Sequence, residues 1–274
     1  MKKHLLAFGA ISVLALTGCG KQKFILGLGG ENVPVGQYAS KILQYYEIDE
    51  KELAANGAIS YGEDVKAVTT QVKQGVVGAG IIYRTDANSA NLKVVGAATK
   101  EMCGQVIYPA AAIQNDAGKL DAAKSFLSYL TNAEAMAEFA NVGFVSACEA
   151  VSEVAQVEDT IVLNVYAAAS LTESLNAIKT KYETAHSNVT LAINFGSSGK
   201  LQTQIEEGKN LCDVFISAGK KQMDALAEGN LIVSDTRMNL LENQVVLAVP
   251  DNNPFNLNSF EDLKDQLLKV LEKK

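Results

Sequence analysis

Short runs of apolar, often β-branched residues alternate from Phe24 onward with segments whose apolar positions recur every three or four residues. The short runs predict strands and the periodic segments predict amphipathic helices. We expect strands at residues 24–28, 58–61, 78–83, 92–96, 105–113, 161–167, 189–195, 213–217 and 244–249. We expect helices between them, including residues 120–130, 133–140 and a tail over 259–274. This alternation is typical of α/β folds in which mainly parallel sheets are flanked by helices.

Residues 145–160 interrupt this alternation. They combine polar side chains such as Glu149, Glu153 and Asp159 with apolar positions that follow no clear period. We interpret the stretch as a linker. Because a domain usually holds about 150 residues, a chain of this length is expected to form two lobes.

The N-terminal residues have the pattern of an export signal. Lys2 and Lys3 precede an apolar run over residues 5–16, which is too short to span a bilayer as a mature helix. The run ends in Leu-Thr-Gly-Cys at Cys19, which resembles the lipobox of bacterial lipoproteins. The resemblance implies a signal peptide over residues 1–18, cleavage before Cys19, and a lipid anchor on that cysteine. The alternative is a buried hydrophobic segment that ends in a structural cysteine.

Composition places the chain among ordinary globular proteins and argues against several function classes. Hydrophobic residues make up 48% of the chain and charged residues 20%, which is enough apolar material for a core. The 24 basic and 31 acidic residues give a net charge of −7, so binding to nucleic acid is not expected. The two histidines, His4 and His186, lie far apart, so neither a His-dependent triad nor a multi-histidine metal centre is expected.

The remaining cysteines do not form a redox or metal motif. Cys103, Cys148 and Cys212 include no C-x-x-C pair, and their odd number cannot be fully paired within the chain. We expect free thiols or at most one disulfide.

Three predicted strand-to-helix junctions carry small residues. Residues 167–173 read Ala-Ala-Ala-Ser-Leu-Thr-Glu, in which Ser170 and Glu173 have the spacing of a capping box. Residues 195–201 contain a Gly-Ser-Ser-Gly turn, and residues 33–36 read Val-Pro-Val-Gly. Free N–H groups and the helix dipole make each such start able to bind an anion. Neutral donors around one gap would favour a fully deprotonated tetrahedral dianion over hydrogen phosphate, whose O–H needs an acceptor.

Each of these residues also has a purely structural interpretation. Ser170 taken alone is an N-cap, Ser198 belongs to a flexible turn, and Tyr83 at the end of a strand is a packing residue. Val35 and Val65 would ordinarily be core or helix-start residues, of which only the backbone could contact a ligand.

Rival nucleotide and hydrolase motifs are incomplete. A phosphate-binding loop would need glycine in place of Asn194 and Ser or Thr in place of Leu201. The Gly-Leu-Gly of residues 27–29 begins like a dinucleotide fingerprint, but Asn32 occupies its last glycine position. Residues 196–199 are one residue short of a nucleophile elbow. No catalytic constellation is therefore predicted.

A set of segments at these junctions is specific when taken together. They are residues 165–172 (VYAAASLT), 194–199 (NFGSSG), 213–218 (DVFISA), 33–39 (VPVGQYA), 80–83 (GIIY) and 108–111 (YPAA). The set resembles the molybdate-binding proteins of ABC transporters, which have the two-lobed type II periplasmic solute-binding fold. The resemblance covers nearly all of residues 24–144 and 161–263.

The resemblance implies which residues contact the oxyanion. They are the side chains of Ser170 and Ser198, the backbone N–H groups of Val35 and Val65, and Tyr83. It implies molybdate or tungstate as the ligand, with no cofactor and no metal bound as a free cation.

The order of the segments departs from the family, in which the segment with Ala-Ala-Ala-Ser comes first. Here it follows the Val-Pro-Val-Gly segment, so the chain resembles a circular permutation whose linker, residues 145–160, joins the usual termini. Such a permutation would place Phe24 near the helix over 259–274, because the termini of a domain often lie close together. The lobes are then expected to comprise residues 24–104 plus 251–274, with Val35, Val65 and Tyr83, and residues 105–144 plus 161–250, with Ser170 and Ser198.

We therefore predict an extracytoplasmic, lipid-anchored monomer that is not an enzyme. It would capture molybdate or tungstate as the lobes close about a hinge, and deliver it to an ABC permease with its ATP-hydrolysing subunits. Two alternatives remain open. One is a binder of another tetrahedral anion, such as sulfate or phosphate, in the same fold. The other is a lipoprotein hydrolase with Ser198 or Ser170 as nucleophile, which would need a base within hydrogen-bond distance.

Overall fold

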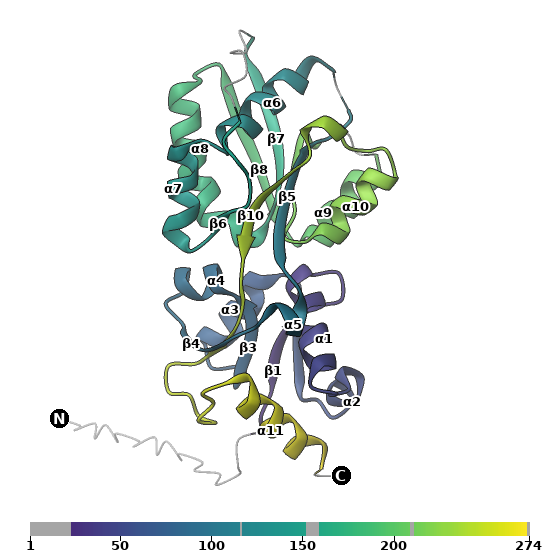
Figure 1. Cartoon of the computed structure of the whole chain (residues 1–274), viewed down its shortest axis with the longest axis vertical. Coiled ribbons are helices and arrows are strands. Elements are labelled where there is room, and N and C mark those ends of the chain that lie inside the picture. The colour runs from purple at the N-terminus through teal and green to yellow at the C-terminus, as the bar shows by residue number, and fades with distance from the viewer. Residues whose placement is uncertain (1–22, 116, 152–158, 209–210, 273–274) are drawn as a thin grey trace, which may run out of the picture.

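The computed structural model describes residues 23–115, 117–151, 159–208 and 211–272. Two α/β lobes are stacked end to end along the long axis of the molecule (Figure 1). The predicted two-lobed α/β fold is confirmed. The expectations for the signal peptide over residues 1–18 and for Cys19 lie outside the described residues.

The first lobe is built on a five-stranded sheet in the order β2-β1-β3-β11-β4. The strands are β1 (Leu26–Gly29), β2 (Ile59–Gly62), β3 (Ala79–Tyr83), β4 (Lys93–Ala97) and β11 (Val245–Val249). The helices are α1 (Pro34–Tyr45), α2 (Glu50–Ala55), α3 (Val65–Lys73), α4 (Arg84–Ser89), α5 (Lys100–Cys103) and α11 (Phe260–Leu271).

The second lobe is built on a six-stranded sheet in the order β6-β10-β5-β9-β7-β8. The strands are β5 (Val106–Ala112), β6 (Val145–Ser146), β7 (Ile161–Ala168), β8 (Val189–Gly196), β9 (Val214–Ile216) and β10 (Met238–Asn243). The α-helices are α6 (Leu120–Tyr129), α7 (Ala133–Val142), α8 (Thr172–Ala185), α9 (Ser198–Glu206) and α10 (Lys220–Glu228). Short 3₁₀ turns are η1 (Ala117–Lys119), η2 (Ala169–Leu171) and η3 (Ser234–Thr236).

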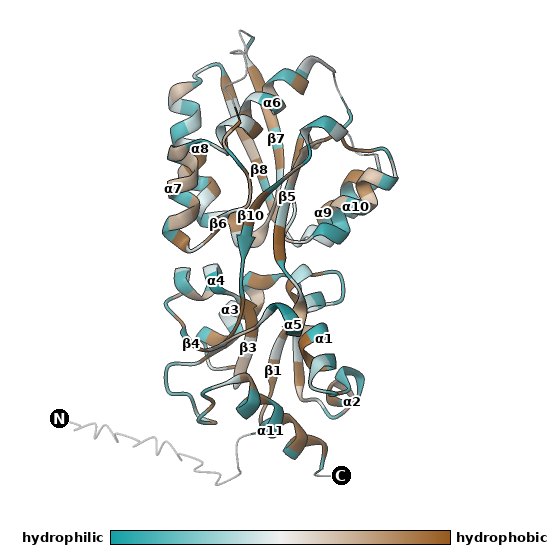
Figure 2. Cartoon of the chain, viewed as in Figure 1, coloured by the Kyte–Doolittle hydropathy of each residue, from teal (hydrophilic) through white to brown (hydrophobic). Residues whose placement is uncertain are grey.

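The hydrophobic pattern explains why these elements form. In α1 the buried residues Val35, Tyr38, Ala39, Ile42 and Leu43 follow the helical period, so one face packs on the sheet. Strand β3 is buried along its whole length because helices and neighbouring strands surround it. Figure 2 shows hydrophobic residues gathered along the strands of both lobes and hydrophilic residues on the outer faces of the helices.

Both sheets are mixed, whereas the sequence predicted mainly parallel ones. Strands β1, β2 and β3 pair in parallel, as do β7, β8 and β9. However, β11 runs antiparallel to β3 and β4, and β5 runs antiparallel to β9 and β10. The departures involve β5 and β11, which enter their sheets directly from the other lobe instead of through a covering helix.

In the described residues the chain crosses between the lobes twice. The first crossing follows α5 at Gly104–Gln105, and the second joins β10 to β11 at Asn243–Gln244. Strand β11 was expected in the lobe made of residues 105–144 plus 161–250, but it pairs within the sheet of the first lobe. The boundary therefore lies near Gln244 and not after residue 250, because an extended segment can pass from one sheet into another without a turn signal.

The region expected to be a linker contains some regular structure at its start. Strand β6 pairs antiparallel with β10, and the backbone N–H of Val151 donates to Thr131 Oγ1 at 2.9 Å. Residues 152–158 lie outside the described residues. On either side of this region, α7 and α8 are joined by an ion pair of 2.7 Å between Glu138 and Lys181.

Segments from the two ends of the described chain pack together in the first lobe. The rings of Phe24 and Phe255 meet edge to face with their centroids 4.9 Å apart, and α11 begins soon after Phe255, at Phe260. Cys103, Cys148 and Cys212 carry free thiols. Within residues 23–272, as far as they are described, no helix is long and apolar enough to cross a membrane.

Candidate oxyanion site between the lobes

All five residues that the sequence selected lie around one small pocket where the lobes meet. The pocket has a cavity volume of about 10 Å³, far below the range of about 300–1,000 Å³ usual for sites that bind organic ligands. The lobes therefore leave no space for an organic ligand, and only a small group can lie between them. It is lined by Val33, Pro34, Val35, Asp64, Val65 and Tyr83 of the first lobe and by Ala168, Ala169, Ser170, Gly196, Ser197, Ser198 and Ala218 of the second.

The first lobe presents the starts of two helices to this pocket. Val35 is the second residue of α1 and Val65 is the first residue of α3, positions where backbone N–H groups have no acceptor inside the helix. Helix α1 has no side-chain cap, because its N-cap residue is Val33. In α3 the N-cap Asp64 accepts from the N–H of Ala67 at 2.9 Å through Oδ1, so one of its two carboxylate oxygens is bound to the helix.

Ser198 is the first residue of α9 and is fully buried. The preceding residue, Ser197, is the N-cap, and its Oγ accepts from the N–H of Lys200 at 3.4 Å. The Oγ of Ser198 accepts from the N–H of Ala218 at 3.0 Å. The two serines of the turn therefore have different roles. Ser197 caps the helix, whereas Ser198 lines the pocket and its hydroxyl hydrogen is available to a ligand.

Ser170 does not form the capping box that the sequence predicted. The N-cap of α8 is Leu171, without a side-chain hydrogen bond, because the turn η2 delays the start of the helix beyond Ser170. The Oγ of Ser170 lies instead 2.8 Å from the hydroxyl oxygen of Tyr108. Glu173, the other expected member of the box, pairs with Lys66 of the first lobe. The prediction was wrong because both side chains have stronger partners far away in sequence.

Tyr83 ends β3 and is almost completely buried. Its hydroxyl donates to the carbonyl oxygen of Ala218 at 3.4 Å, across the interface between the lobes. Burial, together with the neighbouring Tyr108 hydroxyl, raises the pKa of Tyr83 well above its usual value. Tyr83 therefore stays protonated and can act as a hydrogen-bond donor at physiological pH.

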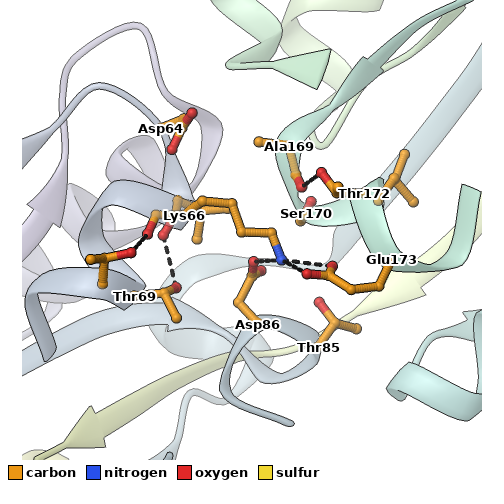
Figure 3. Close-up of polar contacts among 12 residues, drawn as sticks. Asp64, Lys66, Thr69, Thr85, Asp86, Ala169, Ser170, Thr172 and Glu173 are labelled. Carbon is orange, nitrogen blue, oxygen red and sulfur yellow. Dashed lines mark hydrogen bonds and ion pairs between the residues drawn. The ribbon is translucent and has the colours of Figure 1, made fainter. Parts of the chain in front are cut away.

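No lysine, arginine or histidine occurs among the described residues that line the pocket. Figure 3 shows a charged cluster in which Lys66 lies between Asp86 of its own lobe and Glu173 of the other. Lys66 Nζ is 3.1 Å from Asp86 Oδ1 and 2.7 Å from Glu173 Oε2. The ammonium group is thus balanced by two carboxylates and connects the lobes beside the pocket.

Asp86 is the buried member of this cluster. Its side chain has no exposed surface, and neither carboxylate oxygen makes a hydrogen bond with acceptable angles. Burial raises the pKa of Asp86 to about 6, although the Lys66 charge opposes the shift. Burial lowers the pKa of Lys66, but the Asp86 and Glu173 carboxylates outweigh this effect and raise it overall.

Further contacts hold the lobes in a closed arrangement. Lys200 Nζ of α9 lies 2.7 Å from Glu63 Oε2 at the exposed rim. Gly199 faces Asn32, and a Cβ atom on Gly199 would lie only 2.2 Å from the Asn32 carbonyl oxygen. A residue with a side chain at Gly199 would therefore force the lobes apart.

A wider hollow lies beside α1 and α2 of the first lobe and reaches Lys221 of α10 in the second. Its lining holds four carboxylates, those of Glu31, Glu47, Asp49 and Glu50, against the two lysines Lys51 and Lys221. The excess of negative charge disfavours an anion there.

Sequence reasoning missed the residues that support the pocket from behind. Tyr108 stood in a matched segment, and its position in a buried strand gave the only signal. Asn243 donates to Tyr108 at 3.2 Å, but it lies in β10, a strand that the pattern did not predict. The cluster of Lys66, Asp86 and Glu173 depends on contacts over long sequence separations, for which a single sequence gives no signal.

The hydrolase alternative finds no support in this geometry. His186 stacks on Tyr182, and its Nδ1 lies 3.0 Å from the Tyr182 carbonyl oxygen in the second lobe. Ser170 and Ser198 have Tyr108 and the Ala218 N–H as partners, neither of which is a general base at neutral pH.

Comparison with known proteins identifies the family. A family model described as bacterial extracellular solute-binding protein matches residues 15–145 and 163–271, most of the chain. The chain belongs to this family. These are extracytoplasmic binding proteins, which confirms the prediction that the chain is not an enzyme.

Two curated relatives of this solute-binding protein match part of the chain. YvgL of Bacillus subtilis, described as an ABC transporter substrate-binding lipoprotein, is 33% identical over 44% of this chain and 46% of its own length. The molybdate-binding protein ModA of Haemophilus influenzae is 33% identical over 40% of this chain and 42% of its own length. The aligned region thus spans less than half of each of these relatives.

A solved structure supports the fold over the whole molecule. The phosphate-binding protein of a phosphate ABC transporter from Streptococcus pneumoniae covers 90% of this solute-binding protein and 96% of itself, with a TM-score of 0.55. At 12% sequence identity this likeness shows the fold alone.

Proposed function

We propose that this solute-binding protein captures molybdate or tungstate in the pocket between its lobes and passes it to an ABC importer. The observation that carries the proposal is the meeting of donors from both lobes in one small pocket without a lining cation. Val35 and Val65 offer backbone N–H groups, and Ser170 and Ser198 offer hydroxyls. Tyr83 can donate its hydroxyl hydrogen to the ligand in place of the Ala218 carbonyl oxygen.

Neutral donors can hold a dianion in such a site. A hydrogen bond to a charged partner contributes about 1.5–3 kcal/mol, so several converging donors replace the lost hydration of the ion. Hydrogen phosphate retains a proton at neutral pH and would need an acceptor in the pocket. The lining includes one carboxylate, that of Asp64, whose Oδ1 accepts from the Ala67 N–H. Five candidate donors against this single carboxylate favour a fully deprotonated tetrahedral oxyanion.

The relatives support the same ligand. ModA of Haemophilus influenzae is named a molybdate-binding protein, and it shares 33% identity with the matched part of this chain. The set of hydrogen-bond donors does not distinguish molybdate from tungstate, which differ in metal–oxygen bond length. Both ions are therefore proposed.

Thermal unfolding in the presence of molybdate, tungstate, sulfate and phosphate tests the proposal. A ligand at 100 times its dissociation constant stabilises the folded state by about 2.7 kcal/mol. We expect molybdate and tungstate to raise the melting temperature by several degrees, and phosphate to have little effect. A larger shift with sulfate or phosphate would favour a binder of another tetrahedral anion. No shift with any oxyanion, or turnover of an ester substrate, would reject the proposal.

We further propose that the protein is a lipoprotein anchored through Cys19, working as a monomer with a permease and its ATP-hydrolysing subunits. The Leu-Thr-Gly-Cys sequence and the lipoprotein description of YvgL support this. Mass spectrometry of protein purified from membranes is expected to find an acylated Cys19 at the N-terminus. A mature chain that begins elsewhere, without lipid, would contradict it.

The order of the halves is proposed to be a circular permutation of the family order. Two observations support this: Phe24 packs on Phe255 close to α11, and each curated match covers less than half of the chain. A reordered chain in which residues 159–272 precede residues 23–151 through a flexible linker is expected to fold and keep its oxyanion affinity. If the reordered chain fails to fold while the chain in its original order folds, the result would argue against the permutation.

A further inference from the structure

We propose that Asn243 and Tyr108 are positioning residues that orient the Ser170 hydroxyl as a donor to the bound oxyanion. This inference rests on the function proposed above and extends it to residues outside the pocket. It is carried by a continuous chain of hydrogen bonds from the crossing between the lobes to the pocket wall.

The chain of hydrogen bonds begins with a side-chain amide whose orientation is fixed. Asn243 Oδ1 accepts from the backbone N–H of Gln244 at 2.8 Å, and a backbone N–H can only donate. The Nδ2 group must therefore face the other way, where it donates to Thr85 Oγ1 at 3.0 Å and to the Tyr108 hydroxyl at 3.2 Å. Both hydrogens of Nδ2 are used, and Tyr108 is an acceptor toward Asn243.

Tyr108 then has one direction left for its own proton. Its side chain is completely buried, and burial raises the pKa of Tyr108 well above its usual value, so the hydroxyl keeps its hydrogen. The Ser170 Oγ at 2.8 Å can accept it. The opposite direction, from Ser170 to Tyr108, would leave the buried Tyr108 proton with only the hydroxyl of Tyr83 beside it, a poorer acceptor site than Ser170 Oγ at 2.8 Å, which is costly.

Ser170 is thereby left as a donor to the pocket. Its Oγ accepts from Tyr108, and Ser170 lines the pocket whereas Tyr108 does not. The Ser198 hydroxyl is also left as a donor, because its Oγ accepts from the Ala218 N–H at 3.0 Å. Both serine hydrogens are therefore available to a ligand that only accepts, and neither oxygen readily accepts from a protonated oxyanion.

Asn243 also couples this orientation to the arrangement of the lobes. It lies at the crossing between β10 and β11, and its amide bonds Thr85 at the start of α4 in the first lobe and Tyr108 of β5 in the second. Movement about the crossing would disturb the amide, so Ser170 is oriented when the lobes are closed.

A double-mutant cycle on molybdate binding, measured by calorimetry, tests the proposal. Tyr108→Phe is expected to weaken molybdate binding by about three- to tenfold, the effect of one hydrogen bond. In a Ser170→Ala background the same substitution is expected to cause no further loss, because there is no hydroxyl left to orient. Hydrogen phosphate binding should weaken less than molybdate binding, so the ratio of the two affinities falls.

Tyr182→Phe is the matched control. Tyr182 is also a buried tyrosine that donates to a serine, Ser125 Oγ at 3.4 Å, but it lies in the second lobe away from the pocket. It should leave molybdate affinity unchanged. If Tyr108→Phe does not fold, Asn243→Ala replaces it in the cycle with the same expectation.

The outcomes separate this inference from the proposed function. If the wild type binds molybdate but the two substitutions act additively, the positioning role is overturned and the function stands. If the wild type binds no oxyanion, both are overturned. A loss that persists in the Ser170→Ala background would show a structural role for Tyr108 alone.

Discussion

The two lobes contribute different kinds of donor to the same pocket. The first lobe offers the backbone N–H groups of Val35 and Val65, which are aimed by helix geometry, and one hydroxyl, that of Tyr83. The second offers the hydroxyls of Ser170 and Ser198, which can rotate and need partners to hold their direction. A backbone N–H is present whatever the side chain, except in proline. A serine hydroxyl is lost on substitution by alanine, and when present it can rotate so that its oxygen accepts a hydrogen bond instead of donating one. Under the proposed function, selectivity against protonated anions would therefore depend mainly on the two serines of the second lobe.

Removal of both serine hydroxyls is expected to have the largest effect on binding. Ser170→Ala and Ser198→Ala should each weaken molybdate binding by about tenfold or more, and together by at least roughly a hundredfold, because each removes a charge-assisted hydrogen bond. Calorimetric titration measures this. Ser174→Ala is the control, since buried Ser174 donates to the Leu171 carbonyl oxygen at 3.1 Å outside the pocket. Equal losses in control and test variants would contradict the assignment.

The lobes also differ in how they treat a buried carboxylate, which predicts a pH effect. Asp86 of the first lobe has Lys66 as its partner, whereas Asp213 of the second accepts from the backbone N–H of Asn164 at 2.7 Å and pairs with Lys119 at 3.3 Å. The pKa of Asp86 is raised from 3.8 to about 6, so the folded state holds the proton more tightly than the unfolded chain. Its contribution to stability is thus present below pH 4 and is lost as the pH rises toward 6.

Denaturant unfolding of the ligand-free protein between pH 4 and 7.5 tests this effect. Relative to Asp86→Asn, the wild type should lose on the order of 3 kcal/mol of unfolding free energy across that range. Asp213→Asn, by contrast, should destabilise the protein at neutral pH because it breaks an ion pair. Parallel pH profiles for the wild type and Asp86→Asn would contradict the prediction.

A backbone donor of the first lobe can be removed with proline. Val65 is the first residue of α3, where proline is well tolerated, and the preceding Asp64 has the extended backbone (φ −153°, ψ 179°) that proline requires. Val65→Pro should weaken molybdate binding by about tenfold with little loss of stability, because its N–H has no acceptor within the helix. Val65→Ala keeps the N–H and should bind nearly normally. Equal affinities for the two variants would mean that this N–H does not contact the ligand.

The charged bridge beside the pocket should have the smallest effect. Glu173→Gln removes the second-lobe partner of Lys66 while Asp86 remains. Because Glu173 is 44% exposed, we expect molybdate binding to weaken by no more than about fivefold, and the difference to shrink at high salt. Glu134→Gln, which disrupts a contact with Lys181 inside the second lobe, should leave affinity unchanged. A salt-independent loss would point to a contact other than the ion pair.

Local patterns in the sequence predicted most of the elements and three of the junctions at the pocket, whereas the full set of five pocket residues came from the family resemblance. The helix around Ile42 and the strand that ends at Tyr83 follow from the spacing of apolar residues, which burial on a sheet enforces. Residue-level roles were harder to predict. The capping box at Ser170 was wrong because Tyr108, in a distant strand, competes for the same hydroxyl. Strand β11 was placed in the wrong lobe because hydrophobic alternation is the same in either sheet.

The close approach of Gly199 to Asn32 has a consequence for ligand size. Two backbones in van der Waals contact act as a rigid stop, so the closed lobes cannot tighten further around a smaller guest. An ion smaller than the space between the lobes would have longer hydrogen bonds to some of the donors. A larger ion would keep Gly199 and Asn32 from coming into contact. Under the proposed function, discrimination by ion radius would then depend on the main-chain atoms of Gly199 and Asn32, which do not contact the ion themselves.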